Sequence, residues 1–177
     1  MNYNNREIER KFTIKGYDYR IQAYEMRNIR QGLLNTHGKN EVRVTIRDQY
    51  AWICIKSNED DINRFEWEHP ISVEEAETLL KTCCVSRIIE KTRYMVLSGE
   101  GLIWEVDEFH GDDEGLVIAE IEVPSKDYEI EIPEWIDEEV TGNRKYYNHT
   151  LCLISWKDQS KYEEDWSEFM KMNRCGY

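Results

Sequence analysis

The chain has 177 residues, of which 40% are hydrophobic and 12% aromatic, so it suits one folded domain spanning residues 1–177 with a single core. Its 36 acidic and 23 basic residues give a formal net charge of -13. This charge disfavours binding to nucleic acid or to an anionic membrane surface, because both attract positively charged proteins. The sequence contains no apolar leader and no stretch approaching the length of a membrane span.

The 5 cysteines are odd in number and lack the spacing of a disulfide framework, so we expect reduced thiols and a cytoplasmic protein. The histidines are scattered, and no Cys/His cluster has the spacing of a zinc site.

Several short segments alternate polar and apolar residues with a period of two, which predicts β-strands. In chain order they cover residues 7–12, 41–47, 51–56, 64–68, 90–96, 104–109 and 117–123. No internal repeat or Pro/Gly-rich linker interrupts them. The chain therefore reads as one domain rich in antiparallel strands.

Helical patterns lie between and after these strands. Ser72 and Glu75 form a capping box before an apolar stripe, and Ser160 with Glu163 predicts a last helix over about residues 160–173. Residues 134–141 and 144–156 predict two shorter helices broken at Gly142. The segment from Tyr17 to Leu34 also favours a helix, ending before Gly32.

The strand faces carry paired charges of a recurring kind. Glu7, Glu9 and Lys11 share one face, as do Arg43, Thr45 and Arg47 of the second strand. A sheet with one face in water would explain charge on any single strand. If helices instead cover the apolar faces, the charged faces turn inward and form a closed sheet with a charged interior.

A charged interior of this kind suits a triphosphate, which carries roughly four to five negative charges near neutral pH. Arginine and lysine bind phosphate oxygens, and the basic candidates are Lys11, Arg43, Arg47, Lys56, Arg64, Lys91 and Arg93. Carboxylates hold Mg²⁺ or Mn²⁺, and the acidic candidates are Glu7, Glu9, Glu120, Glu122, Asp107 and Glu105. With no serine or cysteine nucleophile beside a base, direct attack by water fits these residues. The absence of a GxxxxGK[ST] run excludes a P-loop protein.

The ordered motifs resemble the CYTH domain family, also called triphosphate tunnel metalloenzymes. The motifs are EIERKF, EVRV, AWICIKS, RFEWE, IIEKTRY, WEVDEFHG, VIAEIEV and VTGNRKYYN, and they resemble the small bacterial members over about residues 6–156. The resemblance implies an α+β fold: an eight-stranded antiparallel β-barrel forming a tunnel, with helices packed outside. It also implies a divalent metal, Mg or Mn. We expect two ions, one to neutralise the phosphates and a second to position or deprotonate the attacking water.

The resemblance also implies a role for individual residues, according to the motif in which each one lies. Glu7 and Glu9 correspond to metal-site carboxylates, completed by the distal pair Glu120 and Glu122, and Lys11 corresponds to a phosphate ligand. Further phosphate ligands are Arg43, Lys56, Lys91 and Arg93, while Arg64, Glu66, Glu68 and Asp107 match tunnel-lining positions. Thr45 stands where the family commonly has arginine, and Leu33 stands where some members have tyrosine. Arg47 lies on the same strand face and is the candidate replacement for the missing arginine.

The predicted activity is hydrolysis of inorganic tripolyphosphate to pyrophosphate and phosphate. Thiamine triphosphate and nucleoside triphosphates stay open as substrates. Two alternatives remain: an adenylyl cyclase that converts ATP to cyclic AMP, and a non-catalytic module that binds polyphosphate or nucleotide. The sequence leaves the preferred metal and the oligomeric state open.

Overall fold

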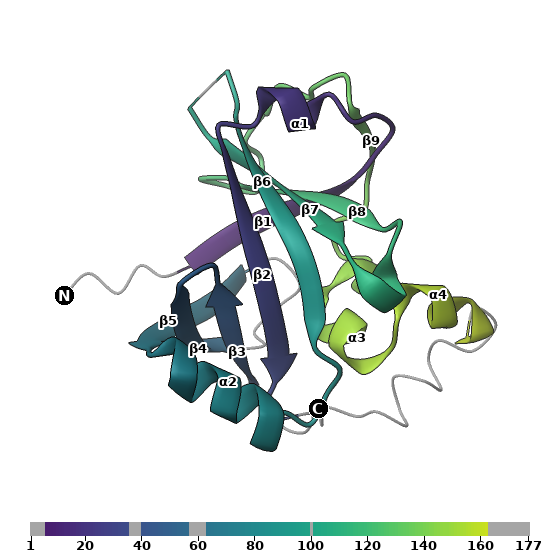
Figure 1. The fold of residues 1–177 in the computed structure, drawn as a ribbon. Coiled ribbons are helices and arrows are strands. Elements are labelled where there is room, and N and C mark those ends of the chain that lie inside the picture. Colours follow the sequence, from purple (N-terminus) through teal and green to yellow (C-terminus); the bar gives the residue numbers. More distant parts are fainter. Residues whose placement is uncertain (1–5, 36–39, 57–62, 100, 163–177) are drawn as a thin grey trace.

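A computed structural model of the chain describes residues 6–35, 40–56, 63–99 and 101–162. These residues form a nine-stranded antiparallel sheet with helices packed against it (Figure 1). The strands are β1 Arg6–Ile14, β2 Glu25–Leu33, β3 Glu41–Arg47, β4 Tyr50–Lys56, β5 Asn63–Ile71, β6 Ile89–Leu97, β7 Ile103–Phe109, β8 Val117–Glu122 and β9 Ile136–Glu139. Every strand predicted from the period-two pattern is therefore confirmed.

The strand order is β5-β4-β3-β2-β6-β7-β8-β1-β9, and β1 also pairs with β5. The strand β1 makes this connection because its two halves have different partners. Its first residues, from Arg6 to Ile8, pair with β5, whereas Glu9 to Thr13 pair with β8. The same strand then pairs irregularly with β9 through Phe12 and Ile14.

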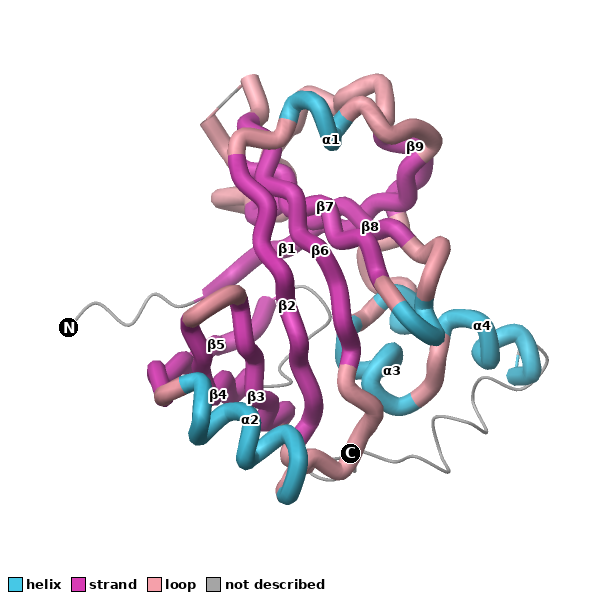
Figure 2. The backbone as a smooth tube through the Cα atoms, viewed as in Figure 1, coloured by secondary structure: helices cyan, strands magenta, loops and turns pink. Residues whose placement is uncertain are grey.

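The helices are short (Figure 2). They are α1 Tyr19–Gln22, α2 Val73–Thr82, α3 Asn148–Leu153 and α4 Trp156–Gln159, with 3-10 turns at Gly111–Asp113, Arg144–Tyr146 and Ser160–Tyr162. The helix α2 packs on the apolar face of β3, but α3 packs on the strand faces that carry the charged residues, so the prediction that the helices lie outside the sheet is wrong for α3. The predicted capping box of Ser72 and Glu75 is present at the start of α2. None of the described helices is long and apolar enough to cross a membrane.

The core explains which face of each strand turns outward. On β3, Val44 and Ile46 pack against Ala76 and Leu80 of α2. The alternate residues Arg43, Thr45 and Arg47 consequently point to the opposite face, as the period-two pattern predicts. A second cluster packs Phe12 and Trp104 with Trp135, and a third joins α3 to β2, β6 and β8.

Two helix predictions are wrong. The segment 17–34 contains only the four-residue α1 and then continues as the strand β2. The segment 134–141 forms β9, which gives the sheet nine strands where eight were expected. The prediction for 144–156 holds in part, because that segment contains a 3-10 turn, α3 and the first residue of α4. Most of the predicted helix 160–173 lies outside the described residues.

Candidate active site

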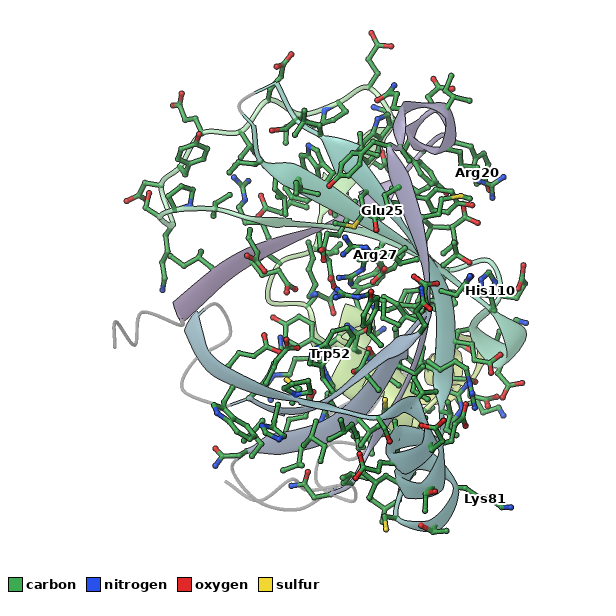
Figure 3. The ribbon with its side chains drawn as sticks, turned by 60° about the vertical axis from the view of Figure 1, so that its left-hand side comes forward. Arg20, Glu25, Arg27, Trp52, Lys81 and His110 are labelled. Carbon is green, nitrogen blue, oxygen red and sulfur yellow. The ribbon has the colours of Figure 1, made fainter. Side chains whose placement is uncertain are left out.

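One cavity of about 630 Å³ receives side chains from every strand between β1 and β8. Trp52 of β4, which Figure 3 labels near the middle of the molecule, is one of its lining residues. The others are Glu9, Ile29, Gln31, Arg43, Thr45, Arg47, Lys56, Glu66, Glu68, Lys91, Arg93, Glu105, Glu120, Glu122 and Asn148. The structure thus brings together most of the site residues predicted from the sequence, including five of the basic candidates.

The guanidinium of Arg93 connects the basic and acidic sides of this cavity. Its Nε lies 2.6 Å from Asp107 Oδ1, and its Nη2 lies 2.7 Å from Asp107 Oδ2 and 3.0 Å from Glu120 Oε2. Its Nη1 also donates to Glu105. Four contacts to three carboxylates hold this cation in one orientation beside the cavity.

Lys11 is buried between two carboxylates. Its Nζ donates to Glu9 and to Glu120, and only 10% of its side chain is exposed. Burial disfavours its charge, but the two glutamates outweigh that effect and raise the pKa of Lys11. Lys11 is therefore a cation at neutral pH.

Asp107 lies beneath the lysine and arginine of β6. Its side chain is 1% exposed, it accepts from Lys91 and Arg93, and it is not among the residues that line the cavity. Burial and the nearby positive charge of Arg93 lower the pKa of Lys91. The negative charge of Asp107 opposes this shift but does not cancel it. The geometry places Asp107 as the counter-ion of two phosphate-ligand candidates, while its role as a metal ligand stays a prediction.

Four glutamates form an acidic wall, defined here as Glu9, Glu105, Glu120 and Glu122. They come from neighbouring strands, since Glu105 is opposite Glu120 and Glu122 is opposite Glu9 in the strand pairing. The same four residues, together with Gly101, Leu102, Ile103 and Ile121, line a smaller cavity of about 290 Å³. The acidic wall is the largest gathering of carboxylates along the main cavity.

The pKa values within the acidic wall diverge. Burial raises the pKa of Glu122, and the neighbouring carboxylates of Glu105 and Glu9 add to the rise. Burial likewise raises the pKa of Glu105, with Glu120 and Asp107 adding to it. Burial opposes ionisation of Glu120 as well, but Lys11 and Arg93 lower its pKa overall. Repelling carboxylate oxygens are a donor set that fits a hard divalent cation, so the acidic wall could hold Mg²⁺ or Mn²⁺.

A second charged group surrounds Arg43. Its guanidinium lies 3.4 Å from Glu41 and 3.4 Å from Glu66, and Lys56 Nζ lies 2.7 Å from Glu66. Burial works against ionisation of Glu41, yet His149 and Arg43 lower its pKa to about 2. Burial disfavours the charges of Arg43 and Lys56, but the nearby glutamates outweigh it and raise the pKa of both, so these candidate phosphate ligands stay charged.

Among the described residues, one set of three metal-ligating atoms lies mutually within 4.8 Å: those of Cys54, Glu66 and Glu68. Burial raises the pKa of the Cys54 thiol, which donates to Glu66 Oε1 at 2.6 Å. A protonated thiol is a poor ligand for a hard cation, so this set suits Mg²⁺ or Mn²⁺ less well than the acidic wall, whose donors are all carboxylates.

Two predicted site residues, Glu7 and Arg64, are opposite one another where β1 meets β5. Their side chains lie outside the described part of the structure, so their roles stay predictions. The sequence analysis did not identify Glu41, Gln31 or Asn148 as site residues. Of these, Asn148 lies beside Lys91, with 3.3 Å between Asn148 Oδ1 and Lys91 Nζ. Glu41 shares a strand face with Arg43, and that alternation could have identified it.

Comparison with known proteins agrees with this architecture. Residues 5–150 match the CYTH domain family. An inorganic triphosphatase of Acetivibrio thermocellus is 39% identical over 153 residues, covering 86% of this chain and 97% of that protein. An inorganic triphosphatase of Nitrosomonas europaea is 34% identical over 151 residues, covering 83% and 97%. The chain belongs to the CYTH domain family.

Solved structures share the fold. A crystal structure of an inorganic triphosphatase superposes with a TM-score of 0.61 at 30% identity, covering 83% of this chain and 94% of that chain. A protein from Pyrococcus horikoshii gives a TM-score of 0.55 at 18% identity, covering 68% of this chain and 79% of that chain, and so shares the fold alone.

Proposed function

We propose that this protein hydrolyses inorganic tripolyphosphate to pyrophosphate and phosphate in a metal-dependent reaction. The observation that carries the proposal is the cavity of about 630 Å³ in which basic side chains and the acidic wall meet. The similarity to two inorganic triphosphatases over most of their length supports the same reaction.

We further propose that the strands β1 to β8 act as a closed tunnel with β9 added outside β1. The pairing of β1 with β5 supports this closure, because it joins the two ends of the remaining strand order. At one end α3 contributes Asn148 to the cavity, while Leu151 and Cys152 pack in the core beneath. A polyanion in such a tunnel is surrounded by protein and exchanges water for fixed charges.

Each residue group has a distinct task in this proposal. The basic groups bind and orient the phosphate chain; they are Lys11, Arg43, Arg47, Lys56, Lys91 and Arg93, with Arg64 as a further candidate. The carboxylates of Glu7, Glu9, Glu105, Glu120 and Glu122 would hold two divalent ions, Mg or Mn. When bound, the divalent cation neutralises phosphate oxygens and promotes ionisation of water.

The reaction adds one water molecule across one phosphoanhydride bond. The water oxygen bonds to a terminal phosphorus, the bond from that phosphorus to the bridging oxygen breaks, and the bridging oxygen leaves with pyrophosphate. The protons of the water pass to the products and to solvent. Arg93 and Lys91, held by Asp107, would stabilise negative charge on the phosphate oxygens as this bond breaks.

A product assay tests the function. The protein is incubated with tripolyphosphate, ATP or thiamine triphosphate, with Mg or Mn, and the products are separated chromatographically. We expect pyrophosphate and phosphate from tripolyphosphate, and loss of this activity when a chelator removes the metal. Cyclic AMP from ATP would instead support the cyclase, and binding without any product would support a non-catalytic module.

Two arginine substitutions, one at the cavity and one away from it, form a matched test of the site. Arg93→Ala should lower kcat/KM for tripolyphosphate roughly 10- to 150-fold, since it removes a charge-assisted contact worth about 1.5–3 kcal/mol. Arg20→Ala should leave kcat/KM unchanged, because Arg20 pairs with Glu108 and is absent from the residues lining the cavity. Figure 3 shows Arg20 at the outer edge of the molecule. Equal effects of the two substitutions would contradict the assignment of the cavity.

A further inference from the structure

Three polar atoms on one side of the cavity are buried and have no hydrogen-bond partner among the described residues. They are Gln31 Nε2, Arg43 Nε and Thr45 Oγ1. All three residues line the cavity, and Gln31 is 3% exposed. We refer to these three residues as the donor wall.

The strand register brings the donor wall together. Gln31 of β2 is directly opposite Thr45 of β3, and Arg43 lies two residues from Thr45 on the same strand face. On the other side, Thr45 is opposite Trp52 of β4, whose ring lies 4.4 Å from the Arg47 guanidinium carbon. Arg47 therefore stacks on Trp52, and Gln31 and Thr45 form a neutral patch beside it.

Unpaired donors are unfavourable in a buried setting, where a polar group without a partner costs about 1–3 kcal/mol. Arg43 directs its two Nη atoms at Glu41 and Glu66, which leaves its Nε–H without an acceptor. Gln31 Nε2 and Arg43 Nε can only donate, and a threonine hydroxyl can also donate. The donor wall therefore offers hydrogen bonds to the acceptor oxygens of a ligand in the cavity.

We propose that Gln31 and Thr45 are substrate-binding residues that donate neutral hydrogen bonds to phosphoryl oxygens of the triphosphate, beside Arg43. This inference rests on the proposed function. It assigns Thr45 a role at a position where related proteins commonly have arginine, and it gives Gln31 a role that the charge pattern does not reveal. Neutral donors fix the position of the oxygens without adding positive charge.

The test compares Gln31→Leu and Thr45→Val with a matched control, Thr92→Val. Thr92 is also a strand threonine, but its hydroxyl lies 2.8 Å from His110 Nε2 and it does not line the cavity. With tripolyphosphate and Mg, each donor-wall substitution should lower kcat/KM about three- to tenfold, as expected for one neutral hydrogen bond. Thr92→Val should keep the wild-type value.

Stability separates a binding role from a structural one. Replacing an unpaired buried donor with an apolar group removes an unfavourable feature of the free protein. Gln31→Leu and Thr45→Val should therefore keep or increase the free energy of unfolding in urea while kcat/KM falls. Lower stability together with wild-type kcat/KM would overturn the proposal.

A charged substitution tests which kind of ligand Gln31 faces. Gln31→Glu adds a carboxylate where a phosphoryl oxygen should lie, so kcat/KM should fall more than tenfold. An unchanged or higher kcat/KM would show that Gln31 faces the cation, and would overturn its role as a phosphate donor.

The two proposals fail in distinguishable ways. Suppose the wild type hydrolyses tripolyphosphate and both donor-wall variants have the same kinetics as the wild type. The proposed function then stands, and this inference is refuted. If the wild type binds tripolyphosphate without hydrolysing it, the inference is tested by affinity: weaker binding in both variants supports it, and equal binding refutes it. A wild type that neither binds nor hydrolyses tripolyphosphate refutes both.

Discussion

Glu120 and Glu122 share one face of β8 but differ in their electrostatic surroundings. Glu120 accepts from Lys11 and Arg93, whereas no described cation lies within ion-pair distance of Glu122. The pKa of Glu120 is lowered by these cations, and that of Glu122 is raised by burial and by Glu105 and Glu9. Two carboxylates predicted for the same task thus contribute differently to the metal-free protein.

Substitution by glutamine should therefore change stability in opposite directions. At pH 7 without metal, Glu120→Gln should lower the free energy of unfolding by about 3–5 kcal/mol, because breaking a buried pair leaves Lys11 and Arg93 partly uncompensated. Glu122→Gln should maintain or raise stability, since it removes repulsion. Urea denaturation in the presence of chelator measures both values.

The pH dependence follows from the same shifts. A lowered pKa means that the contribution of Glu120 is present above its unfolded pKa and is lost as the pH falls through its folded pKa. A raised pKa means that ionised Glu122 disfavours the fold, and that this cost disappears as the pH falls through its folded pKa. The effects of both substitutions should shrink toward acid pH. A Glu120→Gln effect that is constant from pH 7 to pH 3 would contradict the ion-pair explanation.

Alternation in the sequence predicted most of the charged cavity residues, because a strand places every second side chain on one face. It could not predict their partners. Lys11 meets Glu120 across 109 positions of sequence, and Arg93 meets Glu120 across 27. Gln31 was not identified from the sequence for a different reason: its side chain is neutral, so it does not contribute to the pattern of charges. Which carboxylates repel and which are neutralised depends on register, and register is a property of the folded sheet.

Among the elements, β2 was wrongly predicted as a helix, because on this strand an apolar residue faces the charged cavity and a charged residue faces outward. Ile29, an apolar residue, faces the cavity, while Arg30 faces outward and pairs with Glu77 of α2. Met26, Ile29 and Leu33 are then spaced like the apolar stripe of a helix. The strand β9 was misread similarly, because Trp135, Ile136 and Val140 also have helical spacing. Both strands are specified by their neighbours in the sheet.

Gly32 in β2 permits the close approach of the segment that follows α2. A Cβ at this position would lie 2.5 Å from Cys84 Sγ and 3.2 Å from Leu80 Cδ2. Gly32→Ala should therefore lower the free energy of unfolding in urea by about 1–3 kcal/mol through overpacking. Adding Cys84→Ala should recover part of that loss, because it removes the sulfur.

Gly16→Ala is the control for this substitution. A Cβ on Gly16 would meet Trp135 Cβ at 3.8 Å, an ordinary contact, so its effect should stay within about 0.5 kcal/mol. Equal losses at Gly16 and Gly32, or no recovery from Cys84→Ala, would show that the close approach does not limit stability.

For the whole molecule, a cavity lined by every strand from β1 to β8 links ligand binding to unfolding. Tripolyphosphate with Mg should raise the free energy of unfolding by about 2.7 kcal/mol at a concentration of 100 times its Kd. The thermal denaturation midpoint measures this rise, with sulfate at equal ionic strength as the control. A shift of the same size with sulfate would indicate a general salt effect and contradict specific binding.

The general architecture was predictable because strand pattern, capping box and ordered motifs agreed. The family assignment from those motifs is confirmed by the match over residues 5–150. The ninth strand and the double pairing of β1 were not predictable, since both depend on contacts between segments far apart in the chain.

The double pairing of β1 also has a consequence for how the chain folds during synthesis. Lys11 can pair with Glu120 only after the chain has grown by a further 109 residues, which takes roughly 5 to 20 s at about 5–20 residues per second. Throughout that time β1 lacks its β8 partner, and an unpaired strand can pair wrongly with other chains. Charged residues on a strand edge discourage such pairing. We therefore expect the alternating glutamates and lysine of β1 to oppose aggregation of the nascent chain.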